Sequence, residues 1–237
     1  MSRAVTADTD FSVDAAALSA PESPRTLAEA ARVFVRHGSP RFLLTANAIV
    51  LTARAVAGGF SVWDLALCAT IFALWPVQEW LIHVFILHYE PVRIGRWTLD
   101  FRVPIKHRAH HRDPWNLEIL FIPVQGFFLS LPLLLLIFAG LMPTLGLALT
   151  GLSFYMLMSL RYEWVHFLVH TRYRPKSEYF KRLWRNHRLH HCKNEHYWFG
   201  VTMTGGDLLL RTSPDPTTVP LSATVRTLGI ESDSPLE

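Results

Sequence analysis

Four long apolar segments dominate the pattern of hydrophobic and polar residues along the chain. Residues 119–141 run for 23 positions without a charged side chain, which is long enough to cross the hydrocarbon core of a bilayer. Two more segments, 63–88 and 144–170, begin apolar and then gain charged and histidine residues, so each is predicted to be a helix that leaves the membrane at its C-terminal end. The segment 42–59 contains Arg54 and a shorter apolar run, so it either spans the bilayer or lies on its surface.

Polar segments flank these four helices. The first 24 residues are rich in Ser, Ala, Asp and Thr and are predicted to be a disordered tail. The sequence Thr26-Leu-Ala-Glu29 is typical of a capping box, and it predicts a short amphipathic helix at the membrane interface that Gly38 and Pro40 stop. The predicted organisation is a disordered tail over 1–24, a membrane-embedded domain over 25–211 and a C-terminal tail over 212–237.

The charged residues predict how these segments are oriented. Lys and Arg total 23 against 19 Asp and Glu, which gives a net charge of +4. They concentrate before residue 42 and in residues 89–118 and 171–211, whereas the two short hairpin loops between apolar segments hold none. By the positive-inside rule, both termini and the middle loop are cytoplasmic, with Arg54 snorkelling to the outer interface. Such a basic face is typical of attraction to anionic lipid headgroups, and no nucleic-acid partner is expected.

Histidine is the residue type that carries candidate chemistry. Ten of the twelve histidines form four clusters with the spacings HxxxxH, HxxHH, HxxxH and HxxHH. All four clusters fall on the predicted cytoplasmic side, at the ends of two long apolar segments or just beyond them. The two cysteines, Cys68 and Cys192, are too few for a thiolate zinc ribbon. The ten candidate metal ligands are therefore His83, His88, His107, His110, His111, His166, His170, His187, His190 and His191.

The spacings suit metal coordination. Residues three or four apart on a helix share a face, so each HxxHH cluster, like the HxxxH pair, is predicted to aim its nitrogens at one point. The HxxxxH pair, His83 and His88, does not share a face of a regular helix, so it needs a helix end, a bulge or two different metals.

The number of histidines predicts a dinuclear centre, because ten neutral imidazoles are too many for one ion. Imidazole suits Fe, Zn, Cu and Ni alike. Zinc does no redox chemistry and usually takes four ligands, so iron fits a histidine-rich site beside lipid better, although zinc can occupy the site in a purified or crystallised sample.

A faint internal repeat relates the two halves of the chain. Glu79-Trp80 precedes the first histidine pair and Glu163-Trp164 precedes the second, and an HxxHH cluster follows each. This repeat suggests a pseudo-twofold arrangement. Because Glu79 and Glu163 lie one or two helical turns from candidate ligands, each is predicted to accept a ring N–H and to set the tautomer of a histidine.

The order of these motifs resembles the fatty acid hydroxylase and sterol desaturase superfamily, and within it the fatty acid 2-hydroxylase branch. The resemblance rests on the four histidine clusters, on the sequence HHCKNEHYWFGVT and on Asp207, and it covers roughly residues 79–212. It implies that the ten histidines hold two metal ions on a four-helix membrane fold. It also implies O2-dependent, di-iron hydroxylation of a membrane lipid or fatty acyl chain, at C2 in that branch. Gly206 departs from the pattern, which usually has a tryptophan there.

The expected fold class is an all-α integral membrane protein with four transmembrane helices and a cytoplasmic, histidine-rich dimetal cap. The lipid substrate is expected to enter from the bilayer. No counterpart of a fused cytochrome b5 domain is recognised, so electrons are expected from a separate donor of the cytochrome b5 or ferredoxin type.

Three alternatives stay open at this point. A sterol or carotenoid hydroxylase or desaturase of the same superfamily shares much of the histidine pattern. A membrane metal transporter would place His, Asp or Glu deep within its spans, and residues 65–77, 119–141 and 145–160 contain none. A structural zinc site needs fewer than ten ligands.

Overall fold

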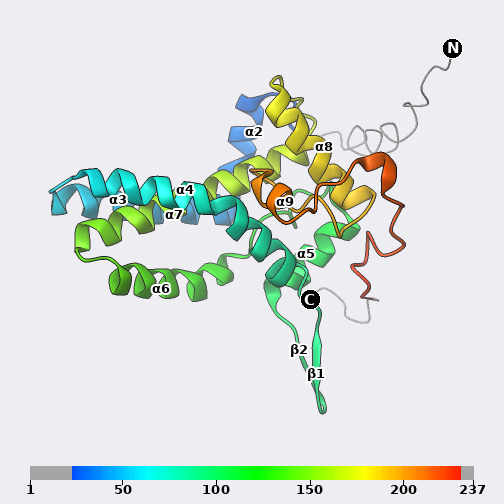
Figure 1. The fold of residues 1–237 in the computed structure, drawn as a ribbon, viewed down its shortest axis with the longest axis horizontal. Helices are drawn as coiled ribbons and strands as arrows, with labels where there is room; N and C mark the ends of the chain where they lie inside the picture. The colour runs from blue at the N-terminus through cyan, green and yellow to red at the C-terminus, as the bar shows by residue number, and fades with distance from the viewer. Residues whose placement is uncertain (1–22, 231–237) are drawn as a thin grey trace.

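Helices make up most of the structure, a computed structural model that describes residues 23–230. Helices α3, α4, α6 and α7 form an elongated bundle, and η1, α5, α8 and α9 gather with the C-terminal segment at one end of it as a cap (Figure 1). The elements are α2 (Leu27–Phe34), α3 (Gly38–Ala57), α4 (Val62–Ile82), the π-helix η1 (His83–Leu87), β1 (Val92–Ile94), β2 (Trp97–Leu99), α5 (Arg102–Arg112), α6 (Val124–Leu141), α7 (Leu145–Val169), α8 (Glu178–Cys192), α9 (Gly205–Leu209) and the 3-10 helix η2 (Pro216–Thr218).

Two helices are long and apolar enough to cross a membrane. They are Val62–Leu87, which joins α4 to η1, and Val124–Leu141, which is α6. Only 11% of the apolar stretch of each is buried inside the protein, so their side chains face outwards as those of lipid-facing helices do, unlike a buried core helix. Two of the four predicted spans therefore meet this test of length and hydropathy.

The capping box predicted at the start of the first helix is confirmed. The Glu29 amide donates to the Thr26 hydroxyl at 3.2 Å, and the Glu29 carboxylate accepts from the Thr26 amide at 3.3 Å. The helix buries Phe34 against Phe121 and Phe167, however, so its apolar face packs on α7 rather than at a free interface. Gly38 and Pro40 begin α3 instead of merely stopping α2, because proline is tolerated in a first helical turn.

The prediction that Arg54 snorkels to the outer interface is wrong. Its side chain is 3% exposed and pairs with Asp64 across 2.7 Å. It also donates to the Thr150 hydroxyl at 2.7 Å and to the Gly58 carbonyl. A charge is tolerated inside a bundle when it is paired and hydrogen-bonded, and this network joins α3, α4 and α7 at the end opposite the cap (Figure 1).

The all-α prediction missed a β-hairpin. Strands β1 and β2 pair antiparallel, with Val92 opposite Leu99 and Ile94 opposite Trp97. Gly95 in the turn has a φ of +62°, a conformation that glycine adopts without strain and that two-residue hairpin turns require. The hairpin stands out from the rest of the molecule, across the long axis of the bundle (Figure 1).

The described part of the predicted C-terminal tail, residues 212–230, packs on the cap. Val219 and Val225 are buried, and the Ser222 amide donates to the Lys193 carbonyl at 2.8 Å. This segment therefore contributes to the candidate site, beyond the predicted domain boundary at residue 211. The disordered tail predicted over 1–24 lies almost wholly outside the described residues, as do residues 231–237.

Candidate metal centre

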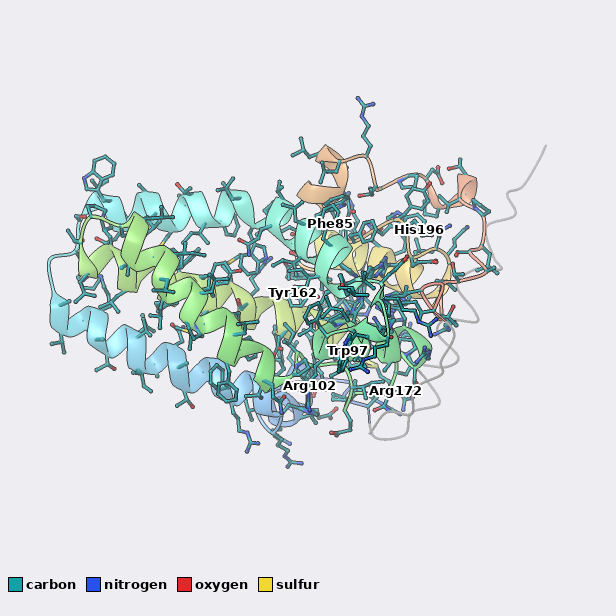
Figure 2. The ribbon with its side chains drawn as sticks, turned by 90° about the horizontal axis from the view of Figure 1, so that it is seen from below. Phe85, Trp97, Arg102, Tyr162, Arg172 and His196 are labelled. Carbon is teal, nitrogen blue, oxygen red and sulfur yellow. The ribbon has the colours of Figure 1, made fainter. Side chains whose placement is uncertain are left out.

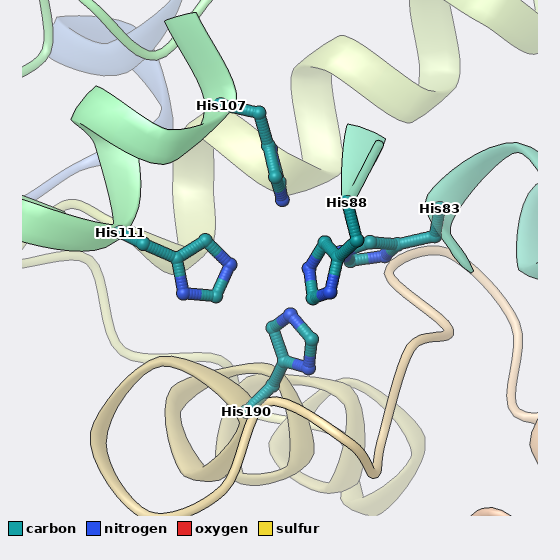
Figure 3. A group of neighbouring side chains, drawn as sticks. All are labelled: His83, His88, His107, His111 and His190. Atoms are coloured by element: carbon teal, nitrogen blue, oxygen red, sulfur yellow. The ribbon is translucent and has the colours of Figure 1, made fainter. Parts of the chain in front are cut away.

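All ten candidate histidines come together in the cap, in two groups of five. Within each group, one ring nitrogen of every histidine lies within 4.8 Å of those of the other four. Figure 3 shows the first group, whose rings turn toward a common point from different elements. The first group is His83, His88, His107, His111 and His190, and the second group is His110, His166, His170, His187 and His191.

Each HxxHH cluster divides between the two groups, so the prediction that each cluster aims at one point is wrong. In α5, His107 and His111 belong to the first group and His110 to the second. In α8 the assignment is reversed, because His190 alone joins the first group. With 3.6 residues per turn, position i+3 lies about 60° to one side of i and position i+4 about 40° to the other. A helix between two sites therefore serves both, and this exchange matches the predicted pseudo-twofold arrangement.

The HxxxxH pair is brought together by a bulge, one of the three predicted possibilities. The backbone over His83–Leu87 is a π-helix, and the His88 amide donates to the His83 carbonyl five residues earlier at 3.1 Å. This i→i+5 bond places the two rings on the same side, with centroids 5.0 Å apart. The second pair, His166 and His170, reaches a similar separation of 4.9 Å at the regular C-terminal end of α7.

The two groups touch each other. The rings of His111 and His191, one from each group, have centroids 4.2 Å apart, and those of His190 and His187, again one from each group, are 5.8 Å apart. This proximity is typical of a dinuclear centre rather than of two independent metal sites.

The ring nitrogens have the properties that metal ligands need. Nine of the ten histidines are buried, and each of the ten has at least one buried ring nitrogen without a hydrogen-bond partner among the described residues. Burial lowers the pKa of the histidines on α5 and α8, to about 3 for His111, so these rings are neutral at physiological pH. Neutral imidazole is the form that binds metal, and an ion would satisfy nitrogens that are otherwise costly to bury.

Backbone carbonyls, not carboxylates, orient three rings of the first group. The Nδ1 atoms of His83, His190 and His111 lie 2.6, 2.8 and 3.0 Å from the carbonyl oxygens of Phe199, Tyr197 and Val225, respectively. Because a carbonyl can only accept, each Nδ1 carries the proton and donates it, which leaves Nε2 for a metal. Residue type gives no signal for such partners, since every residue has a carbonyl.

The first two of these carbonyls belong to a loop that two carboxylates hold in place. Trp198, the buried residue between Tyr197 and Phe199, has a φ of +57°, which is rare for a bulky side chain. Asp207 accepts the backbone N–H groups of Phe199 and Gly200 at 3.0 and 2.8 Å. Glu79 accepts the N–H groups of Val201 and Thr202.

The predicted role of Glu79 and Glu163 as acceptors of a ring N–H is therefore not what the structure shows. Among the described residues, Glu79 accepts no hydrogen bond from a histidine. It accepts from the backbone of the loop whose carbonyls bind His83 and His190. Glu163 accepts from the Ser39 hydroxyl and from the Ile122 amide at 3.1 Å, so it ties α7 to α3 and to the segment before α6. Both glutamates are buried, as expected for carboxylates with structural partners.

Gly206, which departs from the motif, lies where α9 meets α4. A Cβ atom at this position would stand 2.2 Å from the Pro76 carbonyl oxygen, so only glycine permits this close approach. This close packing places the next residue, Asp207, where it accepts from the amides of Phe199 and Gly200.

The remaining two histidines lie outside both groups. His37 stacks on Phe121 at a centroid distance of 4.2 Å. The side chain of His196 is 70% exposed, on the outside of the cap (Figure 2).

Comparison with known proteins agrees with this site. Residues 68–212 match the family model described as fatty acid hydroxylase. The human protein "Fatty acid 2-hydroxylase" is 27% identical over 142 residues, which cover 54% of this chain and 34% of that relative. The Arabidopsis thaliana protein "Dihydroceramide fatty acyl 2-hydroxylase FAH1" is 26% identical over 60% of this chain and 57% of its own length.

The fold has a counterpart among solved structures. The structure titled "Full length scs7p (only hydroxylase domain visible)" superposes with a TM-score of 0.61 at 24% identity, over 78% of this chain and 68% of that one. The chain spans only about a third of the length of its human relative. The family match covers more than half of the chain and includes all ten clustered histidines. The chain belongs to the fatty acid hydroxylase family, and its curated relatives place it with the fatty acid 2-hydroxylase branch.

Proposed function

We propose that this protein is a non-haem di-iron oxidoreductase that hydroxylates a fatty acyl chain of a membrane lipid, at C2. The observation that carries the proposal is the pair of abutting five-histidine groups in a cap beside apolar, outward-facing helices. The family match and the two 2-hydroxylase relatives support the reaction class. We further propose that α3 and α7 complete a four-span bundle, with both termini and the cap cytoplasmic.

Hydroxylation of an acyl chain needs an activated oxygen species, because an aliphatic C–H bond offers no leaving group for a nucleophile to displace, and a cofactor must supply that species. When bound, two iron ions would supply the activation of O2. One oxygen atom enters the C–H bond, and the other leaves as water with two electrons and two protons from a donor. We propose that the donor is a separate protein of the cytochrome b5 or ferredoxin type.

The chain's own residues hold and orient this chemistry. The ten imidazoles would provide five neutral ligands for each ion, and α5 and α8 each carry histidines of both groups. The carbonyls of Tyr197, Phe199 and Val225 fix the tautomers of three ligands. Zinc, which is also compatible with imidazole, would occupy the site without redox activity.

The proposal is tested by metal content and by lipid product together. Protein purified in detergent should contain about two iron ions per chain. Cells that make it should accumulate acyl chains heavier by one oxygen atom, with the hydroxyl located at C2 by fragmentation. Purified protein supplied with O2 and a reductant should form the same product after loading with Fe(II), and none after loading with zinc.

His196→Ala is the matched control, since it replaces an exposed histidine outside both groups. It should retain metal and product, whereas His107→Ala should lose product. Oxidation of a sterol or carotenoid instead would favour another branch of the superfamily, and loss of two hydrogens would indicate desaturation. An unchanged lipidome with altered cellular metal uptake would contradict the proposal and support a metal transporter.

A further inference from the structure

The β-hairpin over residues 92–99 has no part in the histidine centre and little contact with protein. All six strand residues are exposed, including Trp97 at 68% and Ile94 at 60%. A lone two-stranded hairpin is only marginally stable in water, so it gains from a surface against which to pack. Large apolar side chains left open on a protruding element mark an interaction site.

The hairpin is amphipathic. Residues directly opposite each other in a ladder share a face, so Val92, Leu99, Ile94 and Trp97 form one apolar face. The opposite face carries Arg93 and Thr98, and Arg96 lies at the turn with its guanidinium 5.1 Å from the Trp97 ring. Together with Arg102, just after the hairpin, the segment has three arginines, and Asp100 is the acidic residue within it.

The hairpin closely follows a candidate membrane span in the chain. That span ends at Leu87, and four residues connect it to the start of β1. Its last turn exposes Phe85 and Ile86. Seen from below in Figure 2, Phe85, Trp97 and Arg102 project onto the region where the bundle meets the cap, and Figure 1 shows that the hairpin extends away from this region, across the bundle axis. A hairpin at the end of a span and perpendicular to it lies along the plane of a membrane surface.

The composition of the hairpin fits this position. Tryptophan prefers the level of the lipid headgroups, where its ring is partly apolar and partly wet. Arginines at the same level attract the phosphates of anionic lipids.

The base of the hairpin is fixed to the metal centre. Arg108, which lies between two ligands of α5, forms an ion pair with Asp100 and donates to the Tyr89 carbonyl at 3.0 Å. Tyr89 directly follows His88 in the chain. If the hairpin binds a membrane surface, these contacts also fix the distance between that surface and the first histidine group.

We propose that the hairpin 92–99 is a membrane anchor that inserts its Val92/Ile94/Trp97/Leu99 face among the headgroups of an anionic bilayer. This inference concerns binding to a lipid surface and does not depend on the hydroxylation reaction.

The test places a fluorescent nitrobenzoxadiazole label on either face of the hairpin in the full chain. The two probes are Ile94→Cys, on the apolar face, and Thr98→Cys, on the opposite face, in a background with Cys68→Ala and Cys192→Ala. Each protein is reconstituted in vesicles of phosphatidylcholine with phosphatidylglycerol. Metal content equal to that of the parent protein shows that a variant is folded.

The label at position 94 should be quenched by a nitroxide on the lipid acyl chain and shielded from iodide in the water, and the label at position 98 should show the reverse. Equal quenching of both labels by iodide would overturn the proposal, because the hairpin would then lie in water. Shielding of both labels from both quenchers would also overturn it, in favour of a protein partner such as a second copy of the chain.

The arginines provide an independent arm of the test. In Arg93→Gln with Arg96→Gln, the lipid quenching of the label at position 94 should fall in anionic vesicles toward its value in pure phosphatidylcholine. If quenching in the parent protein is the same in neutral and anionic vesicles, the proposed attraction to anionic lipid is wrong.

Discussion

The first histidine group rests partly on irregular backbone, whereas the second rests on regular helices and the end of one. In the first, His83 and His88 flank a π-helix, and three rings are oriented by carbonyls of loops. In the second, His166 and His170 end an α-helix, and His187 and His191 are one turn apart with ring nitrogens 3.0 Å from each other. The two groups have the same number of ligands but are positioned by different backbone elements. A substitution in the loop that orients the first group should therefore change its metal affinity more than that of the second.

The largest effect is expected from removing one ligand of one group. His107→Ala should lower the metal content of the first group and His187→Ala that of the second, each toward one ion per chain. Product formation should fall to background in both variants, because the proposed reaction uses both ions. Metal analysis and lipid product measure this directly. Loss of both ions from each variant would show that the two groups form a single cooperative site.

A smaller and one-sided effect is expected from the loop that serves the first group. Asp207→Asn removes one of two carboxylate oxygens that accept backbone N–H groups, so the carbonyls of Tyr197 and Phe199 lose their fixed positions. The affinity of the first group for metal should fall about 10- to 100-fold, as is typical when partners of metal ligands are lost. Competition with a chelator should show one weakened and one unchanged ion.

Glu79 provides a matched pair of variants for the same loop. Glu79→Ala leaves two backbone N–H groups unpaired and should weaken the first ion as Asp207→Asn does. Glu79→Gln keeps an amide oxygen for these N–H groups, and its amide nitrogen can donate to the Thr202 hydroxyl. It should therefore behave much like the parent protein. An equal loss in both variants would point to the charge of Glu79 rather than to its hydrogen bonds.

Glu163 should affect stability rather than the first ion. Glu163→Ala removes the acceptor for Ser39 and for the Ile122 amide, and a buried unpaired donor costs about 1–3 kcal/mol. Thermal unfolding in detergent should shift to lower temperature, while metal binding by the first group stays unchanged. Ser39→Ala, which keeps the bond to Ile122, should have a smaller effect.

The smallest difference between the groups is expected for pH. Burial lowers the pKa of histidines in both groups. These are His107, His111 and His190 in the first group and His110, His187 and His191 in the second. Below the unfolded value of 6.5, the unfolded chain binds protons that the folded chain excludes. The stability of the metal-free protein should therefore be retained above pH 6.5 and fall as the pH drops below it. Denaturant unfolding of the metal-free protein across this range measures the trend, and constant stability would contradict it.

The sequence predicted two of the apolar helices and the residues that make up the candidate site. Apolar length and histidine spacing are local properties, so the runs that became α4 and α6 and the ten clustered histidines could be found without a structure. The spacing of His83 and His88 also indicated that a regular helix would not suffice, and a π-helix is what forms there.

Other features depended on contacts between distant residues. From the sequence alone, Arg54 is an unpaired charge within an apolar helix. Its partners, Asp64 and Thr150, lie on two other helices and come beside it only on folding. Glu79 is close in sequence to His83, yet its partners are the amides of residues 201 and 202. The hairpin was missed because strands of three residues carry too short a pattern to predict.

The sequence by itself determined which residues are available as metal ligands, because ten of the twelve histidines fall in four short clusters. Only the tertiary structure decided how they are divided. Positions i+3 and i+4 diverge to either side of a helix, and the packing of α5 and α8 between two other histidine pairs turns that divergence into two sites. The tautomers of His83, His111 and His190 were likewise decided by backbone carbonyls that only folding brings near.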